Sequence, residues 1–206
     1  MQPSDDTEAL IFDCDGTLAD TMPLHFIAWQ NVMTDYGFKF DEALFYSLAG
    51  QPTDLIITQL SQQQEINVDV DKVTREKENA FLELIDQIEP IEPVVEVVKQ
   101  FHQKLPMGVG SGGQREVVKQ ILSTLSLDSI FDCVVGSEDT NLHKPEPDVF
   151  LEVASRLNVE PSRCLVYEDA DLGIEAARRA GMQFVDVRAV HTPRRITTND
   201  SGTTKC

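Results

Sequence analysis

The sequence has few cysteines, and the four it contains are scattered. None of them forms a Cys-x-x-Cys pair, so neither a zinc knuckle nor a redox dithiol is predicted. Three of the four lie in apolar stretches typical of strands, and we expect these to be reduced, buried thiols of a cytoplasmic protein. They are Cys14, Cys133 and Cys164.

Long apolar runs and basic residues are also scarce. No run approaches the roughly 20 residues that cross a bilayer, and the first residues are polar and acidic, unlike a signal peptide. The chain has 17 Lys and Arg against 35 Asp and Glu, a net charge of −18. Such a chain repels nucleic acid and anionic membranes. We therefore expect a soluble, cytoplasmic protein with no nucleic-acid or membrane partner.

Glycine and proline are not abundant, at 11 and 10 of 206 residues, and no internal repeat is found. These absences exclude collagen-like, low-complexity and repeat architectures. Hydrophobic residues make up 41% and charged residues 25%, as in ordinary globular proteins. The length suffices for one core domain, alone or carrying a smaller inserted one.

Short apolar runs predict strands that are buried on both faces of a parallel sheet. Stretches with a helical period alternate with them from about Glu92 to Val187, which predicts βαβ units and an α/β fold. The predicted strands are residues 9–13, 107–110, 133–136, 164–167 and 184–187.

A long helical stretch separates the first predicted strand from the others. Between Thr21 and Pro90 no comparable strand run occurs, and apolar residues recur with a helical period. The proline-rich segment from Pro90 to Pro93 marks the return to the core. We therefore predict a core of residues 1–20 and 91–190 and a helical cap at 21–90. Residues 191–206, rich in Thr, Asn, Ser and Gly, are expected to form a flexible tail.

Polar residues follow four of the predicted strands, where ligands bind in doubly wound sheets. Taken singly, each group is explained by a turn, a helix cap or a solvated charge. Together at one sheet edge they predict a site, and their clustered carboxylates favour a bound cation. The groups are Asp13-Cys14-Asp15-Gly16-Thr17-Leu18-Ala19-Asp20, Gly110-Ser111-Gly112-Gly113, Lys144-Pro145 and Glu168-Asp169.

These groups, in this order, resemble the four motifs of the haloacid dehalogenase superfamily. The resemblance extends from about Leu10 to Val187, and segment 166–182 is similar to the fourth motif of the β-phosphoglucomutase-like branch. It implies a Rossmann-like, doubly wound parallel sheet with an inserted α-helical cap. It also implies an enzyme, a phosphatase of the phosphoric monoester hydrolase class.

The resemblance implies a role for each motif residue. Asp13 is expected to attack phosphorus and form an aspartyl-phosphate, while Asp15 protonates the leaving oxygen and then activates water. Lys144 and Ser111 are expected to stabilise the phosphoryl oxygens. The implied cofactor is Mg²⁺, which takes oxygen ligands. Its expected ligands are the Asp13 carboxylate, the Asp15 backbone carbonyl, Asp169 and, directly or through water, Glu168.

Further residues are expected to contact the substrate. In the core these are Gly16, Thr17, Gly112, Gly113 and Arg115, and in the cap they are His25, Trp29, Gln51 and Lys77. Three of the cap residues, His25, Trp29 and Lys77, also have a structural alternative, because histidine and tryptophan often pack in cores and helical lysines are often only solvated.

Hydrolysis and phosphoryl migration differ in the cations they require. By the resemblance, a mutase grips a second phosphate with a cap-loop arginine and a Ser-Lys-Asn run after the second motif. Here Thr53 falls at the arginine position, and the run reads Gly113-Gln114-Arg115. Because the bidentate donor is missing, the sequence favours hydrolysis.

The cap loop Gly50-Gln51-Pro52-Thr53 resembles that of phosphatases acting on compounds such as fructose 1-phosphate. The predicted function is therefore Mg²⁺-dependent hydrolysis of small sugar monophosphates, with a small phosphorylated sugar as the partner. The alternative is a β-phosphoglucomutase-type phosphomutase, and a third hypothesis is a non-catalytic phospho-acceptor or binding protein. A cap that opens and closes over the site is compatible with a monomer.

Overall fold

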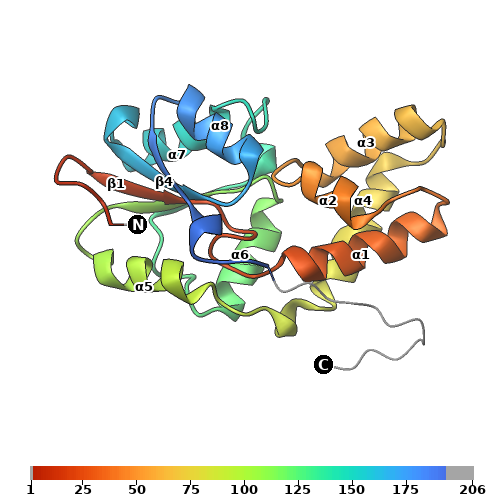
Figure 1. Ribbon diagram of the computed structural model, residues 1–206, viewed down its shortest axis with the longest axis horizontal. Coiled ribbons are helices and arrows are strands. Elements are labelled where there is room, and N and C mark those ends of the chain that lie inside the picture. Colours follow the sequence, from red (N-terminus) through yellow and green to blue (C-terminus); the bar gives the residue numbers. More distant parts are fainter. Residues whose placement is uncertain (1, 194–206) are drawn as a thin grey trace.

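The structure, a computed structural model, describes residues 2–193. Helices lie on both faces of a five-stranded sheet, and a separate group of helices, labelled α1 to α4, stands beside this layered core (Figure 1). The predicted α/β fold, with its parallel sheet and flanking helices, is confirmed.

The sheet is parallel throughout, with strand order β3-β2-β1-β4-β5. Its strands are β1 (Ala9–Phe12), β2 (Met107–Gly110), β3 (Cys133–Val135), β4 (Cys164–Glu168) and β5 (Gln183–Asp186). Each overlaps one of the five predicted runs. The chain runs outward from β1 to β3 and then crosses back to β4, so the strand order reverses beside β1. Ligands bind at such a switch point.

Strand β1 is apolar at every position because both of its faces are covered. Successive side chains of a strand point to opposite faces. Leu10 and Phe12 pack with the helices α5 and α6, whereas Ala9 and Ile11 pack with α7 and α8. Burial of each large side chain contributes about 1.5–3 kcal/mol. The helices are α5 (Glu92–Phe101), α6 (Arg115–Thr124), α7 (Asp148–Leu157) and α8 (Asp171–Arg179).

Helices α1 to α4, which we call the cap, enclose an apolar cluster of their own, with Trp29, Phe45 and Ile57 among its buried members. Asp41 and Asp69 cap α2 and α4 by accepting hydrogen bonds from the backbone N–H three residues on. The cap helices are α1 (Met22–Asp35), α2 (Glu42–Ser47), α3 (Thr53–Gln64) and α4 (Val70–Leu82). Short 3-10 helices lie at Ile85–Gln87, Ser137–Asp139, Pro161–Arg163 and Val187–Ala189.

Two chain segments connect the cap to the core, and they are paired with each other. Ala19 forms an antiparallel bridge with Pro90, and the Asp20 N–H donates to the Glu89 carbonyl at 2.9 Å. The cap is thus joined beside the carboxyl end of β1, where the first polar motif begins. Of the predicted tail, residues 194–206 lie outside the described residues.

The described helices are short, and the longest, α1, has 14 residues. Within residues 2–193, no helix combines the length and apolar character that a bilayer crossing requires. The three described cysteines are free. Cys14 and Cys164 are buried as predicted, but Cys133 is only half-buried because its strand lies at the sheet edge.

Candidate active site

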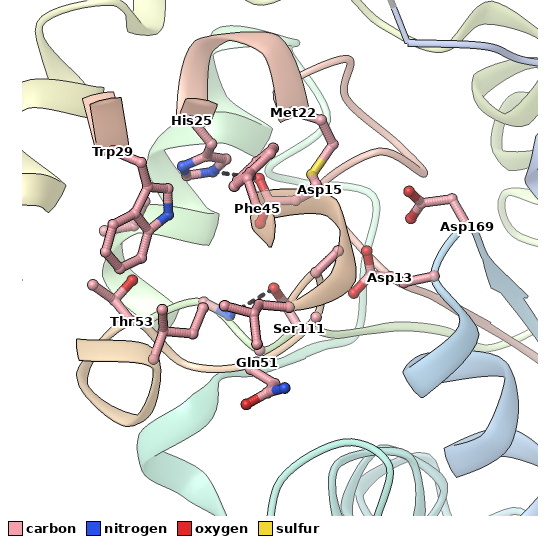
Figure 2. Close-up of a pocket in the computed structure, with 18 of the residues that line it drawn as sticks. Asp13, Asp15, Met22, His25, Trp29, Phe45, Gln51, Thr53, Ser111 and Asp169 are labelled. Atoms are coloured by element: carbon pink, nitrogen blue, oxygen red, sulfur yellow. Dashed lines mark hydrogen bonds and ion pairs between the residues drawn. The ribbon is translucent and has the colours of Figure 1, made fainter. Parts of the chain in front are cut away.

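A pocket opens at the carboxyl ends of β1, β2 and β4, and the cap covers it (Figure 2). Loops after three parallel strands therefore meet the cap at the switch point of the sheet. The core contributes Asp13, Asp15, Ser111, Gly112, Gly113, Val117, Glu168, Asp169 and Ala170. The cap contributes Met22, His25, Trp29, Phe45, Leu48, Ala49, Gly50, Gln51, Thr53, Ile56, Lys77 and Glu78.

A buried lysine joins two carboxylates at the core end of the pocket. Lys144 Nζ donates to Asp13 Oδ1 at 2.6 Å and to Glu168 Oε1 at 2.7 Å. The Ala170 N–H donates to Glu168 Oε2 at 2.6 Å, so both oxygens of Glu168 have partners. Burial would lower the pKa of Lys144, but the charges of Asp13 and Glu168 raise it above its usual value. Lys144 therefore remains an ammonium group.

Asp169 lies on the loop after β4, opposite Asp13 (Figure 2). Thr17 donates its hydroxyl hydrogen to Asp169 Oδ1 at 3.1 Å. Gly16 has a φ of +83°, and a Cβ there would lie 2.2 Å from Asp169 Oδ2. Glycine is required by both the backbone angle and this close approach. Gly16 and Thr17 thus shape the position of Asp169. Both were expected to contact the substrate, but neither lines the pocket.

Three of the carboxylates are close enough to share a cation. Asp13, Glu168 and Asp169 each offer an oxygen within 4.8 Å of the other two. Burial, together with the neighbouring carboxylate charges, raises the pKa of both Asp13 and Asp169. A divalent cation would relieve this repulsion, and carboxylate oxygens are the ligands that Mg²⁺ prefers. The residues present therefore fit a metal ion, although the Asp15 side chain lies outside the cluster.

Asp15 is held by a different set of partners. Thr21 Oγ1 donates to Asp15 Oδ1 at 2.6 Å, and His25 Nε2 lies 3.0 Å from the same oxygen. Lys77 Nζ lies 3.0 Å from His25 Nδ1. Because an ammonium group offers only donors, Nδ1 accepts and Nε2 is left to donate to Asp15. Burial would raise the pKa of Asp15, but His25 and the hydrogen bonds lower it to about 2.

An ion pair lies at the cap end of the pocket. Lys77 Nζ donates to Glu78 Oε1 at 3.1 Å, and Thr53 Oγ1 donates to the same oxygen at 2.5 Å. The two charged side chains are only 4% and 11% exposed. Lys77 also lies 5.3 Å from the ring centre of Trp29. Trp29 has both roles considered for it, because it packs in the cap core and lines the pocket.

The turn after β2 brings the core into contact with the cap loop. The Gly113 N–H donates to Ser111 Oγ at 3.0 Å, which fixes the hydroxyl at the pocket wall. A Cβ on Gly112 would lie 2.3 Å from the Gly50 carbonyl oxygen. The cap loop can approach this closely only because residue 112 has no side chain.

Arg115 is a predicted substrate-binding residue whose guanidinium has a different partner in the structure. Its Nη1 donates to Asp139 Oδ1 at 2.6 Å, and its backbone N–H is shared by both oxygens of Glu138. It is not among the residues that line the pocket. The expected contact with substrate is therefore not supported, because the short 3-10 helix after β3 supplies a carboxylate partner for its guanidinium.

Sequence reasoning missed several pocket residues. The apolar ones, such as Met22, Phe45 and Ile56, repeat with the helical period of a core face, so no signal distinguishes them from packing residues. Glu78 follows Lys77 directly, and adjacent helix residues do not usually face each other. Their ion pair could have been suspected only from the pocket geometry.

Comparisons with known proteins identify the family of the chain. The model of the haloacid dehalogenase-like hydrolases matches residues 10–187. The fructose-1-phosphate phosphatase YqaB of Escherichia coli is 43% identical over 180 residues, covering 87% of this chain and 95% of that protein. A phosphorylated carbohydrates phosphatase of Thermotoga maritima is 36% identical over 182 residues, covering 86% and 83%.

A solved structure points to the same group. The crystal structure of β-phosphoglucomutase from Clostridium difficile has a TM-score of 0.78 and 29% identity, covering 87% of this chain and 84% of that chain. The resemblance seen in the motifs is confirmed, and so is the expectation of an enzyme. The chain belongs to the haloacid dehalogenase-like hydrolase family.

Proposed function

We propose that this protein is a Mg²⁺-dependent phosphatase of small sugar monophosphates that works through an aspartyl-phosphate. The observation that carries the proposal is the pair of carboxylates after β1. Asp13 and Asp15 both line the pocket, yet one is paired with Lys144 and the other with Thr21 and His25. Two carboxylates with different partners are suited to two different roles.

Asp13 is the nucleophile. One of its carboxylate oxygens forms a bond to phosphorus as the bond between phosphorus and the sugar oxygen breaks. Phosphoryl transfer depends on in-line placement and charge neutralisation. Lys144, 2.6 Å from Asp13, offsets charge on the transferring oxygens, and the Ser111 hydroxyl, which lies at the pocket wall, donates to them.

Asp15 moves the proton. In the empty site Asp15 is a carboxylate, so the first step requires that it take up a proton as the substrate binds and pass that proton to the departing sugar oxygen. In the second step, the carboxylate takes a proton from water while the water oxygen attacks phosphorus and releases Asp13 and phosphate. The hydrogen bonds from Thr21 and His25 stabilise the charged form of Asp15, which is the base that the second step needs.

Mg²⁺ would be held by Asp13 and Asp169, with Glu168 beside them and the Asp15 backbone carbonyl as a further ligand. When bound, it would supply positive charge to the carboxylates and the phosphoryl oxygens, which otherwise repel each other. Both oxygens of Glu168 already accept hydrogen bonds, so a direct role for it as ligand has less support than that of Asp169.

The substrate class is inferred from the relatives and from the cap. Two relatives bear the names of a fructose-1-phosphate phosphatase and a phosphorylated carbohydrates phosphatase. The similarity to a β-phosphoglucomutase favours the alternative, a phosphomutase. Against that alternative, Thr53 occupies the position at which a mutase is expected to carry arginine, and its hydroxyl donates a hydrogen bond to Glu78. We still predict that the protein is a cytoplasmic monomer and that its partner is a small phosphorylated sugar.

The test is phosphate release from a panel of hexose and pentose monophosphates, with and without Mg²⁺, beside an Asp13→Asn variant. We expect Mg²⁺-dependent release from at least one monophosphate and none from the variant. Interconversion of glucose 1-phosphate and glucose 6-phosphate with a bisphosphate activator, without net phosphate release, would contradict the proposal and support the mutase.

A further inference from the structure

Glu78 is an acidic side chain in a pocket that is expected to bind an anion. It lies on α4 of the cap, and its side chain is 11% exposed. The carboxylates at the core end have partners there in Lys144 and an expected metal ion. Glu78 stands at the other end of the pocket, and neither of these explains its presence.

The contacts of Glu78 hold it in place. Its Oε1 accepts hydrogen bonds from Thr53 at the start of α3 and from its neighbour Lys77. Hydrogen bonds between the described residues leave its other oxygen, Oε2, without a donor. Burial would raise the pKa of Glu78, but the Lys77 charge and the hydrogen bonds lower it, so it is a carboxylate at neutral pH. Oε2 thus remains able to accept a hydrogen bond from a ligand.

The charge at the cap end is therefore balanced before any ligand enters. Among the described residues that line the pocket, Lys77 is the only lysine or arginine. Its ammonium group is shared between Glu78 and His25. A second phosphate here would meet no free cation and would face the Glu78 carboxylate. Two negative charges placed side by side in a buried site repel each other strongly.

We propose that Glu78 is a specificity-determining residue, which excludes a second phosphate and accepts hydrogen bonds from hydroxyl groups at the non-reacting end of the substrate. This inference rests on the proposed phosphatase function. It deepens that function, since it assigns the preference for monophosphates over bisphosphates to one carboxylate. Thr53 positions that carboxylate, and Lys77 keeps it charged.

The decisive variant is Glu78→Gln, which removes the charge but keeps the shape. We would measure kcat/KM with Mg²⁺ for fructose 1-phosphate and fructose 1,6-bisphosphate. We expect the ratio of bisphosphate to monophosphate to rise about tenfold or more, because Lys77 is freed to bind the second phosphate. Loosening of the fold would lower both values and would not raise this ratio.

The matched control is Glu76→Gln on the same helix. Glu76 is 43% exposed and pairs with Lys72, so its loss removes the same charge outside the pocket. We expect the ratio to change less than about twofold, as for surface charges. Lys77→Gln supplies the reciprocal test. In that variant we expect the ratio of bisphosphate to monophosphate kcat/KM to fall, because the cation has been removed and the Glu78 charge remains. An unchanged ratio in both pocket variants would overturn the inference.

A binding measurement separates this inference from the proposed function. Calorimetry on Asp13→Asn and Asp13→Asn/Glu78→Gln would give the affinities for the same two compounds without turnover. If wild type releases no phosphate but the double variant gains affinity for the bisphosphate, the phosphatase proposal fails and the specificity inference stands. If the affinity ratio does not change, or neither compound binds, the specificity inference is wrong.

Discussion

Two buried lysines serve the two ends of the site, and they are built differently: Lys77 lines the pocket, whereas Lys144 contacts the lining residues Asp13 and Glu168 without lining the pocket itself. Lys144, at the core end, pairs with carboxylates 131 and 24 residues away. Lys77, at the cap end, pairs with the next residue in the chain. The strand order of the sheet creates the first arrangement, whereas local packing of the cap helices creates the second. On our proposal, the reaction chemistry is thus assembled across the sheet, and substrate selection is assembled within helices α1 to α4.

The same contrast shows what an opening cap would separate. Both partners of each ion pair belong to one region, so Lys144–Asp13 and Lys77–Glu78 can survive opening. The contact between His25 on α1 and Asp15 after β1 bridges the two regions at 3.0 Å. On our proposal, closing the cap would complete the surroundings of the acid and base and would couple substrate enclosure to catalysis.

The sharpest test of this comparison replaces each lysine by methionine. Lys144→Met leaves buried carboxylates without their cation, so we expect kcat/KM to fall about 10³-fold, as for the loss of an electrostatic contact to the transferring group. For Lys77→Met we expect kcat/KM to fall about tenfold, because Lys77 acts on substrate binding and on His25. The measurement is phosphate release, with thermal melts as the folding control. A larger loss for Lys77→Met would reverse the assignment of the two ends.

The contact between the regions gives a second test. In Gly112→Ala the new Cβ would lie 2.3 Å from the Gly50 carbonyl oxygen, so the cap loop must withdraw. We expect kcat/KM to fall about 100-fold, because displacements of this size disrupt placement of the reacting groups. Gly113→Ala is the matched control, since its nearest contact would be 3.4 Å from Ser111 Oγ. Equal losses in the two variants would show that the Gly112–Gly50 contact does not control closure.

The two regions also differed in how far the sequence could predict them. Four of the five core strands are short apolar runs followed by a polar motif, so strand ends and the Asp13, Glu168 and Asp169 cluster could be located in advance. In the cap, the pocket wall and the cap core use the same helical period, so residues such as Phe45 could not be assigned. Periodicity identifies a buried face but not what the face is buried against.

A third test concerns the pH range in which the cap pair stabilises the protein. The pKa of Glu78 is lowered below its usual 4.5, so its contribution is complete above about pH 4.5 and is lost as the pH falls through the lowered value. At pH 7 we expect Glu78→Gln to lower the free energy of unfolding by about 1.5–3 kcal/mol, the range for a hydrogen bond to a charged group. Denaturant melts of wild type and variant between pH 3 and pH 7 would measure this difference in the free energy of unfolding. A difference that persists unchanged at the lowest pH would show that the carboxylate charge is not its source.

The smallest effect is expected at Arg115, which the sequence assigned to the substrate and the structure assigns to Asp139. The pair is partly exposed, with side chains 35% and 10% accessible, so screening by solvent limits its contribution to about 1 kcal/mol or less. We expect Arg115→Gln to leave KM for a sugar monophosphate within about twofold of wild type and to lower stability only slightly. Steady-state kinetics beside Asp139→Asn decide the matter. If Arg115 only pairs with Asp139, the two variants will behave alike, whereas a tenfold rise in KM for Arg115→Gln alone would show that its guanidinium reaches the substrate. That outcome would also add a free cation to the pocket and weaken the argument against a second phosphate.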